Sequence, residues 1–164
     1  MATEMGEYVV GAYLELKLGC DFVDYNVRPR GGGMRGLAEF DVIGLDFTSG
    51  NAFLCEVATH LAGLEYGRGY EDSARRLQAK YLRQQEYAQE NLANFQMKRF
   101  MFWSPRVPEG RLLDLLQEIE RLELVVNARY RECVEELKEE ARATMRDTGN
   151  PFFRALQILE HLRQ

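Results

Sequence analysis

Two apolar stretches, residues 37–47 and 51–59, are separated only by a few small polar residues around Gly50. Short polar linkers of this kind suit a tight reversal between antiparallel strands. An earlier strand-rich stretch, residues 20–29, ends at a proline that is followed by three glycines. The three segments together predict a β-meander, and this feature constrains the fold more than any other part of the chain.

Helical periodicity surrounds this meander. Residues 3–18 repeat apolar side chains at spacings near those of a helix and end at Gly19, with Thr3 placed to cap the first turn. Residues 70–92 contain neither glycine nor proline and predict the longest helix. We therefore expect an α/β fold with a mixed central sheet flanked by helices. The rest of the chain continues the alternation, with a strand over 95–105, a helix over 109–121, a strand over 122–126, a helix capped by Asn127 and a last helix after Asn150-Pro151.

Length and composition limit the class of protein. A chain of 164 residues with 46% hydrophobic side chains suits a single domain, residues 1–164. Since no apolar run approaches the roughly 20 residues that cross a membrane, and the first ten residues lack the basic start of a secretion signal, we expect a cytoplasmic protein without a membrane partner. The three cysteines are far apart in the sequence, and we expect them to be reduced and buried.

The charge of the chain is unevenly distributed. Its formal net charge is −5, which argues against binding nucleic acid through overall electrostatic attraction. Residues 61–111 carry nine basic and six acidic residues and form the only sizeable segment with a positive balance. A nucleic-acid partner would therefore meet this segment, and the acidic stretch over 133–142 would repel it.

Two acidic residues lie inside the apolar stretches of the meander. Strand alternation places Glu56 on one face with Leu54 and Ala58, and it places Asp41 on one face with Ile43. Burying a carboxylate costs several kcal/mol unless something compensates its charge. A divalent cation between Asp41 and Glu56 would do so, because Mg²⁺ takes one or two carboxylates, a backbone carbonyl and waters. The alternative is that both acids lie at strand ends in contact with solvent.

At these residues the chain resembles the PD-(D/E)XK nuclease superfamily, which includes archaeal Holliday-junction resolvases and Mrr-type restriction endonucleases. The resemblance lies in the acids of FDVIG and CEVAT, in an early helix that contains Glu7, and in the order of the elements. It covers about residues 3–104 and implies a restriction-endonuclease-like core of the order α-β-β-β-α-β. Residues 105–164 would then add a C-terminal strand and extra helices.

The resemblance also implies roles for individual residues. Asp41 and Glu56 would be catalytic and would bind Mg²⁺ or Mn²⁺, with Val57 as a further metal ligand through its backbone carbonyl. Glu7 would assist the metal. For Glu7 an equally simple interpretation is a first-turn glutamate that interacts with the helix dipole.

One position departs from the family pattern. Where the family has a lysine two residues after the second acid, this chain has Ala58. Members of the superfamily can supply the lysine from a neighbouring element, and Lys80 on the following helix is the catalytic candidate here. His60 is a weaker substitute. Without a cation at this point, the positioning of the water and the stabilisation of charge would weaken.

Two groups of arginines are candidate contacts to nucleic acid. Arg28, Arg30 and Arg35 lie in a glycine-rich turn that could lay guanidinium groups along a phosphate backbone, or could equally be a plain surface hairpin. Arg76 and Arg83 flank Lys80 on the long predicted helix at spacings of four and three. The alternative for this stripe is an ordinary solvated helix face.

The resemblance implies a metal-dependent DNA endonuclease that hydrolyses phosphodiester bonds with a metal-activated water and leaves a 5′-phosphate. Ala58 keeps a second hypothesis open, in which the chain is a catalytically inactive module that binds nucleic acid or a protein. A third hypothesis is an α/β interaction domain unrelated to nucleases. DNA is the expected partner of the first hypothesis, and a homodimer or a protein partner is compatible with each.

Overall fold

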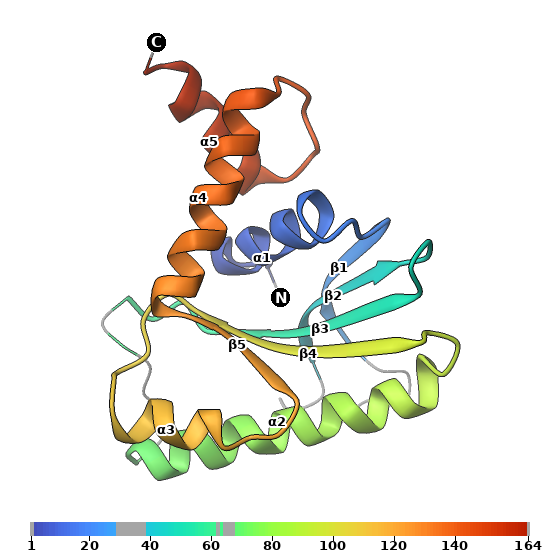
Figure 1. Ribbon diagram of the computed structural model, residues 1–164, viewed down its shortest axis with the longest axis vertical. Helices are drawn as coiled ribbons and strands as arrows, with labels where there is room; N and C mark the ends of the chain where they lie inside the picture. Colours follow the sequence, from blue (N-terminus) through green and yellow to red (C-terminus); the bar gives the residue numbers. More distant parts are fainter. Residues whose placement is uncertain (1, 29–38, 62, 64–67, 164) are drawn as a thin grey trace.

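The computed structural model describes residues 2–28, 39–61, 63 and 68–163. Within them, helices and strands follow one another in the order that the sequence predicts, so the α/β class is confirmed (Figure 1). In chain order they are α1 (Met5–Leu16), β1 (Phe22–Val27), β2 (Phe40–Asp46), β3 (Asn51–Val57), α2 (Tyr70–Asn91), β4 (Met97–Ser104), α3 (Arg111–Gln117), β5 (Leu122–Val126), α4 (Asn127–Ala143) and α5 (Pro151–His161).

The strands form one five-stranded mixed sheet in the order β1-β2-β3-β4-β5. The predicted meander is present, because β1, β2 and β3 pair antiparallel, whereas β4 and β5 add in parallel. The β2–β3 turn is held by the Asp46 carboxylate, which accepts the backbone N–H groups of Thr48 and Ser49 at 2.9 and 3.1 Å. Gly50 then takes a positive φ of 71°, which glycine adopts without strain.

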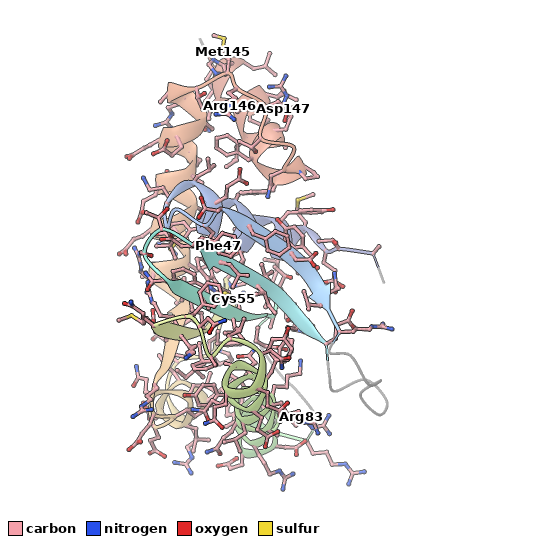
Figure 2. The ribbon with its side chains drawn as sticks, turned by 90° about the vertical axis from the view of Figure 1, so that its right-hand side faces the viewer. Phe47, Cys55, Arg83, Met145, Arg146 and Asp147 are labelled. Carbon is pink, nitrogen blue, oxygen red and sulfur yellow. The ribbon has the colours of Figure 1, made fainter. Side chains whose placement is uncertain are left out.

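Helices cover both faces of the sheet (Figure 1). On one face α1, α4 and α5 enclose a core that includes Trp103, Phe53 and all three cysteines, which are free and buried as expected. On the other face α2 and α3 pack over Leu54 and Phe102. The layer formed by α4 and α5 extends beyond the sheet, so these two helices also pack on each other (Figures 1 and 2). Across the described part of the chain, no helix combines the length and the apolar character needed to span a bilayer.

The start of α1 differs from the prediction. The N-cap is Glu4 rather than Thr3, and the Glu7 carboxylate accepts the backbone N–H of Glu4 at 3.0 Å. This is the reciprocal arrangement of a capping box, which satisfies donors that the first turn leaves without a helical partner. The helix therefore begins later than the sequence suggests.

Two boundaries in the C-terminal third also differ. Asn127 does not cap α4. Instead its side-chain amide pairs with both backbone groups of Val107, at 2.7 and 3.0 Å, and so ties α4 to the loop before α3. The helix predicted over 109–121 is shorter, because Gly110 and Arg121 both have positive φ values, of 88° and 61°, and lie outside it.

Candidate functional site

Asp41 and Glu56 lie side by side on neighbouring strands. In the β2–β3 register Val42 pairs with Cys55, and one step further places Asp41 opposite Glu56. Residues opposite each other in an antiparallel pair share a face, and this is the face that Leu54 presents to α2. Glu56 is only 4% exposed and Asp41 is half-buried. The alternative of two solvent-exposed strand ends is therefore wrong for Glu56.

The two acids share a strained electrostatic environment. Burial, followed by the negative charge of Asp41, raises the pKa of Glu56 to about 8. Burial also raises the pKa of Asp41. The Val57 backbone N–H opposes this shift, because it donates a hydrogen bond to the Asp41 carboxylate at 2.7 Å. A hydrogen bond between the two carboxyl groups further raises the pKa of Glu56 and lowers that of Asp41. Both shifts are thus those expected of two carboxyl groups that are buried beside each other.

Lys80 reaches this pair from α2. Its ammonium group forms an ion pair with the Glu56 carboxylate, and its side chain is 34% exposed. Burial on its own would lower the pKa of Lys80, but the charges of Glu56 and Asp41 raise it. The next residue, Tyr81, fixes this turn of the helix, because it is buried and its hydroxyl donates to the Glu120 carbonyl at 2.8 Å.

Glu7 lies near the pair but is held by other groups. It is buried, and its carboxylate accepts the Asn26 side-chain amide at 3.0 Å as well as the Glu4 N–H. Burial raises the pKa of Glu7, and the charge of Asp41 adds to that shift. Gly6 permits this approach of α1 to the end of β3, since a Cβ there would lie 2.5 Å from the Thr59 hydroxyl oxygen.

The structure describes three of the predicted arginines, Arg28, Arg76 and Arg83. Arg28 is exposed and lies 3.6 Å from the Glu39 carboxylate, while Arg30 and Arg35 lie outside the described residues. Arg76 pairs with an acid of its own helix. Arg83 is exposed on α2 (Figure 2).

Sequence reasoning missed Gln84, which is buried one helical turn after Lys80. Within the described residues its amide nitrogen has no hydrogen-bond partner. The next turn carries Tyr87, whose ring packs on Phe40, the residue before Asp41. Gln84 is therefore on the stretch of α2 that covers the acid pair. Its spacing of three from the buried Tyr81 is the sequence signal that could have found it.

The donor set is suited to a hard divalent cation. Two carboxylates from adjacent strands are the oxygen ligands that Mg²⁺ and Mn²⁺ accept, together with waters and a backbone carbonyl such as that of Val57. A cation between them would remove the repulsion that raises the pKa of Glu56. Among the residues that the structure describes, no three acidic, histidine or cysteine side chains gather into a metal site, and Glu7 as a third ligand stays a prediction.

Comparison of the chain with protein-family models, with curated proteins and with solved structures gave no match. The geometry of Asp41, Glu56 and Lys80 is therefore the feature that bears most directly on function.

Proposed function

We propose that this chain is a metal-dependent phosphodiesterase of the PD-(D/E)XK type that hydrolyses DNA. One observation carries the proposal: two carboxyl groups on adjacent strands, Asp41 and Glu56, meet the ammonium group of Lys80 from the following helix. The order from α1 to β4 agrees with the core that the superfamily resemblance implies, so a restriction-endonuclease-like core is part of the proposal.

Each residue of the site has a distinct role in this proposal. Asp41 and Glu56 would hold Mg²⁺ or Mn²⁺, and the Val57 N–H would keep the Asp41 carboxylate oriented. A bound ion of this kind lowers the pKa of a water ligand and neutralises charge on a phosphate. Lys80 would stabilise the negative charge that develops on the phosphate during attack.

Lys80 also accounts for the missing lysine of the family pattern. Ala58, two residues after Glu56, is small and buried, and it lies on the α2 side of the sheet with Leu54. The cation that the pattern would place there arrives on the same face from α2 instead. The proposed chemistry requires a positive charge beside Glu56, and either the residue at position 58 or a residue of α2 can supply it.

The distribution of charge sets the direction from which DNA would approach. Arg76 and Arg83 lie on α2 with Lys80. The helix α4, whose sequence is rich in acidic residues, lies on the opposite face of the sheet (Figure 1). Phosphate contacts position a duplex without reading its sequence. The α2 side is therefore the proposed DNA-binding side.

One observation favours a second candidate, an inactive module that binds nucleic acid or a protein. The Lys80 ammonium group already pairs with Glu56 and so supplies positive charge where a metal would supply it. In this candidate the three residues form a buried ion cluster without catalysis, and DNA binding is independent of metal.

Calorimetric titration of Mn²⁺ separates the two candidates. Wild type should bind Mn²⁺ and nick plasmid or branched DNA, whereas Asp41→Asn should do neither. Asp114→Asn is the matched control, because Asp114 is an exposed acid on α3, on the same side of the sheet. A wild type that binds no Mn²⁺ and leaves DNA intact contradicts the enzyme, and DNA binding that survives EDTA then supports the module.

A further inference from the structure

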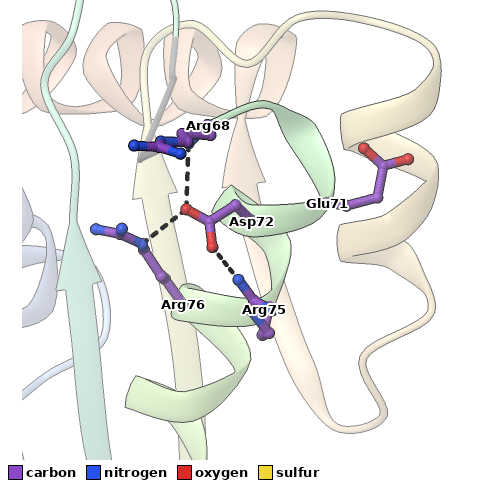
Figure 3. A pocket seen from close by; sticks show the side chains of 5 residues that line it. All are labelled: Arg68, Glu71, Asp72, Arg75 and Arg76. Atoms are coloured by element: carbon purple, nitrogen blue, oxygen red, sulfur yellow. Dashed lines mark hydrogen bonds and ion pairs between the residues drawn. The ribbon is translucent and has the colours of Figure 1, made fainter.

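A hollow of about 550 Å³ lies at the N-terminal end of α2. The described residues that line it are all charged, and no part of the proposed function uses them as a group. The lining residues are Arg68, Glu71, Asp72, Arg75 and Arg76 (Figure 3).

Asp72 is the centre of this group. Its carboxylate is hydrogen-bonded by the Arg75 guanidinium group, lies 3.0 Å from Nε of Arg76, and accepts the backbone N–H of Arg68 at 3.2 Å (Figure 3). The bond from Arg75, followed by that from Arg68, lowers the pKa of Asp72. The Asp72 side chain is 15% exposed, whereas both guanidinium groups are largely exposed.

The neighbouring acid, Glu71, is arranged differently. It pairs with Arg111 of α3 at 3.1 Å and points away from Asp72 (Figure 3). Of the two acids that the structure describes in the hollow, Asp72 is therefore the one that lies between the guanidinium groups. Guanidinium groups and a backbone N–H around one carboxylate are the same donors that bind a phosphate group.

The hollow lies close to the acid pair along the helix. Arg76 precedes Lys80 by four residues, a rise of roughly 6 Å along an α-helix. Phosphates of one DNA strand are separated by about 3.4 Å along the duplex axis. A phosphate at Arg76 would thus lie one or two nucleotides from a phosphate at Lys80.

We propose that this hollow is a phosphodiester subsite for a nucleic-acid strand, and that Asp72 occupies it in the free protein and competes with the strand. The proposal rests on nucleic acid being the ligand of the proposed function. Asp72 holds the guanidinium groups in place when no strand is bound, and its negative charge weakens binding. Removing that charge while keeping the shape of the side chain should strengthen it.

Fluorescence anisotropy tests this with a labelled DNA duplex and a labelled single strand, both in EDTA so that no metal-dependent cleavage occurs. Asp72→Asn should lower Kd about fivefold, and Arg75→Gln or Arg76→Gln should each raise it about five- to tenfold. Each arginine variant should also reduce the slope of log Kd against log salt by about one.

Two controls remove a negative and a positive charge that do not contact Asp72. Glu71→Gln changes the charge one residue away but leaves the Asp72 contacts, and Arg131→Gln removes an exposed arginine of α4 on the other face of the sheet. Each should change Kd by about twofold at most. Thermal melts of all variants show that each is folded.

The outcomes separate this subsite from the catalytic proposal. If wild type cleaves DNA but Kd is unchanged in Asp72→Asn and in both arginine variants, the subsite is overturned and the enzyme proposal is not. The expected pattern of Kd values without cleavage supports the subsite and overturns the enzyme. Equal effects of Glu71→Gln and Asp72→Asn overturn the role of Asp72. Stabilisation by inorganic phosphate without DNA binding points to a small phosphate ligand and overturns the nucleic-acid assignment.

Discussion

Two glutamates, Glu56 and Glu160, are almost equally covered, at 4% and 5% exposure, yet their pKa values are shifted in opposite directions. Hydrogen bonding from Arg142 lowers the pKa of Glu160, and the charges of Arg142 and Arg163 add to this effect. Burial and the charge of Asp41 raise the pKa of Glu56. The sign of the shift depends on whether burial or the bonds from neighbouring cations dominate at the carboxyl group.

The location of each residue explains the contrast. Glu160 belongs to α5, in the α4–α5 layer that extends beyond the sheet (Figure 1). It pairs with Arg142 and Arg163, whose side chains are exposed. Glu56 lies on β3, the middle strand, beneath α2. A buried acid with a raised pKa and a second acid beside it is typical of a functional site, whereas an acid matched by arginines is typical of a structural one.

The largest expected difference is in catalysis. Glu56→Gln should abolish Mn²⁺ binding and reduce DNA cleavage by about a thousandfold or more, because it removes half of the carboxylate pair. Glu160→Gln should leave both unchanged. Initial rates of plasmid nicking and Mn²⁺ calorimetry on the two variants measure this. Equal loss in both would show that the contrast between the glutamates has no functional meaning.

Removing the cationic partner of each glutamate should give the next largest difference. Lys80→Ala should slow cleavage about a hundredfold, since the charge on the attacked phosphate loses its stabilising partner. Arg142→Ala should lower Tm without changing the cleavage rate, because it removes the partner of Glu160 in an ion pair that has no part in catalysis. Cleavage assays and thermal melts distinguish these outcomes. Undiminished cleavage by Lys80→Ala would remove Lys80 from the site.

The pH dependence of stability should also differ in sign. The pKa of Glu56 is raised from 4.5 to about 8, so the folded state binds its proton more tightly than the unfolded state. This contribution to the free energy of unfolding is present below the unfolded value and is lost as pH rises from about 4.5 to about 8. Glu56→Gln should therefore gain stability relative to wild type over that range.

Glu160 supplies the opposite case. Because its pKa is lowered, its stabilisation is present above its ordinary value of 4.5 and is lost as pH falls through the lowered pKa. Glu160→Gln should thus be less stable than wild type at neutral pH, and the difference should shrink in acid. Urea denaturation at several pH values measures both variants. Parallel pH curves for the two variants would contradict the opposite shifts.

The smallest expected effect concerns Glu7. Glu7→Gln keeps an acceptor for the Glu4 N–H, as glutamine does in a capping box, so Tm should stay unchanged. Loss of its charge near Asp41 should weaken Mn²⁺ binding about threefold, because the negative charge attracts the cation. Unchanged Mn²⁺ affinity would leave Glu7 with the capping role alone.

The order of the elements could be predicted because glycines, prolines and apolar periodicity act locally. The predicted cap at Asn127 is wrong because the decisive contact is distant: Asn127 bonds to Val107, twenty residues earlier in the chain, and no local pattern reveals this. The direction of β4 and β5 was likewise undetermined, since parallel pairing depends on how α2 and α3 cross the sheet.

In the candidate site, too, features set by local sequence patterns could be predicted and features set by tertiary packing could not. The short turn between β2 and β3 makes a meeting of Asp41 and Glu56 predictable from sequence, as strand alternation assigns their faces. The position of Lys80 could be suggested only from the family resemblance, because helix spacing alone does not show which side chain reaches a strand. The role of Asp72 in the arginine hollow was not predicted, since charged side chains this close in sequence resemble an ordinary solvated helix face.

The helix α2 is long enough to connect two separate groups of charged side chains. With 22 residues it is about 33 Å long, and it carries the arginine hollow in its first turns and Lys80 near its middle. The two carboxyl groups are fixed by strand pairing, but the ammonium group moves with the helix. A displacement of the first turns along the helix axis would change the separation of Lys80 and Glu56, so under the proposed function α2 would couple the arginine hollow to the acid pair.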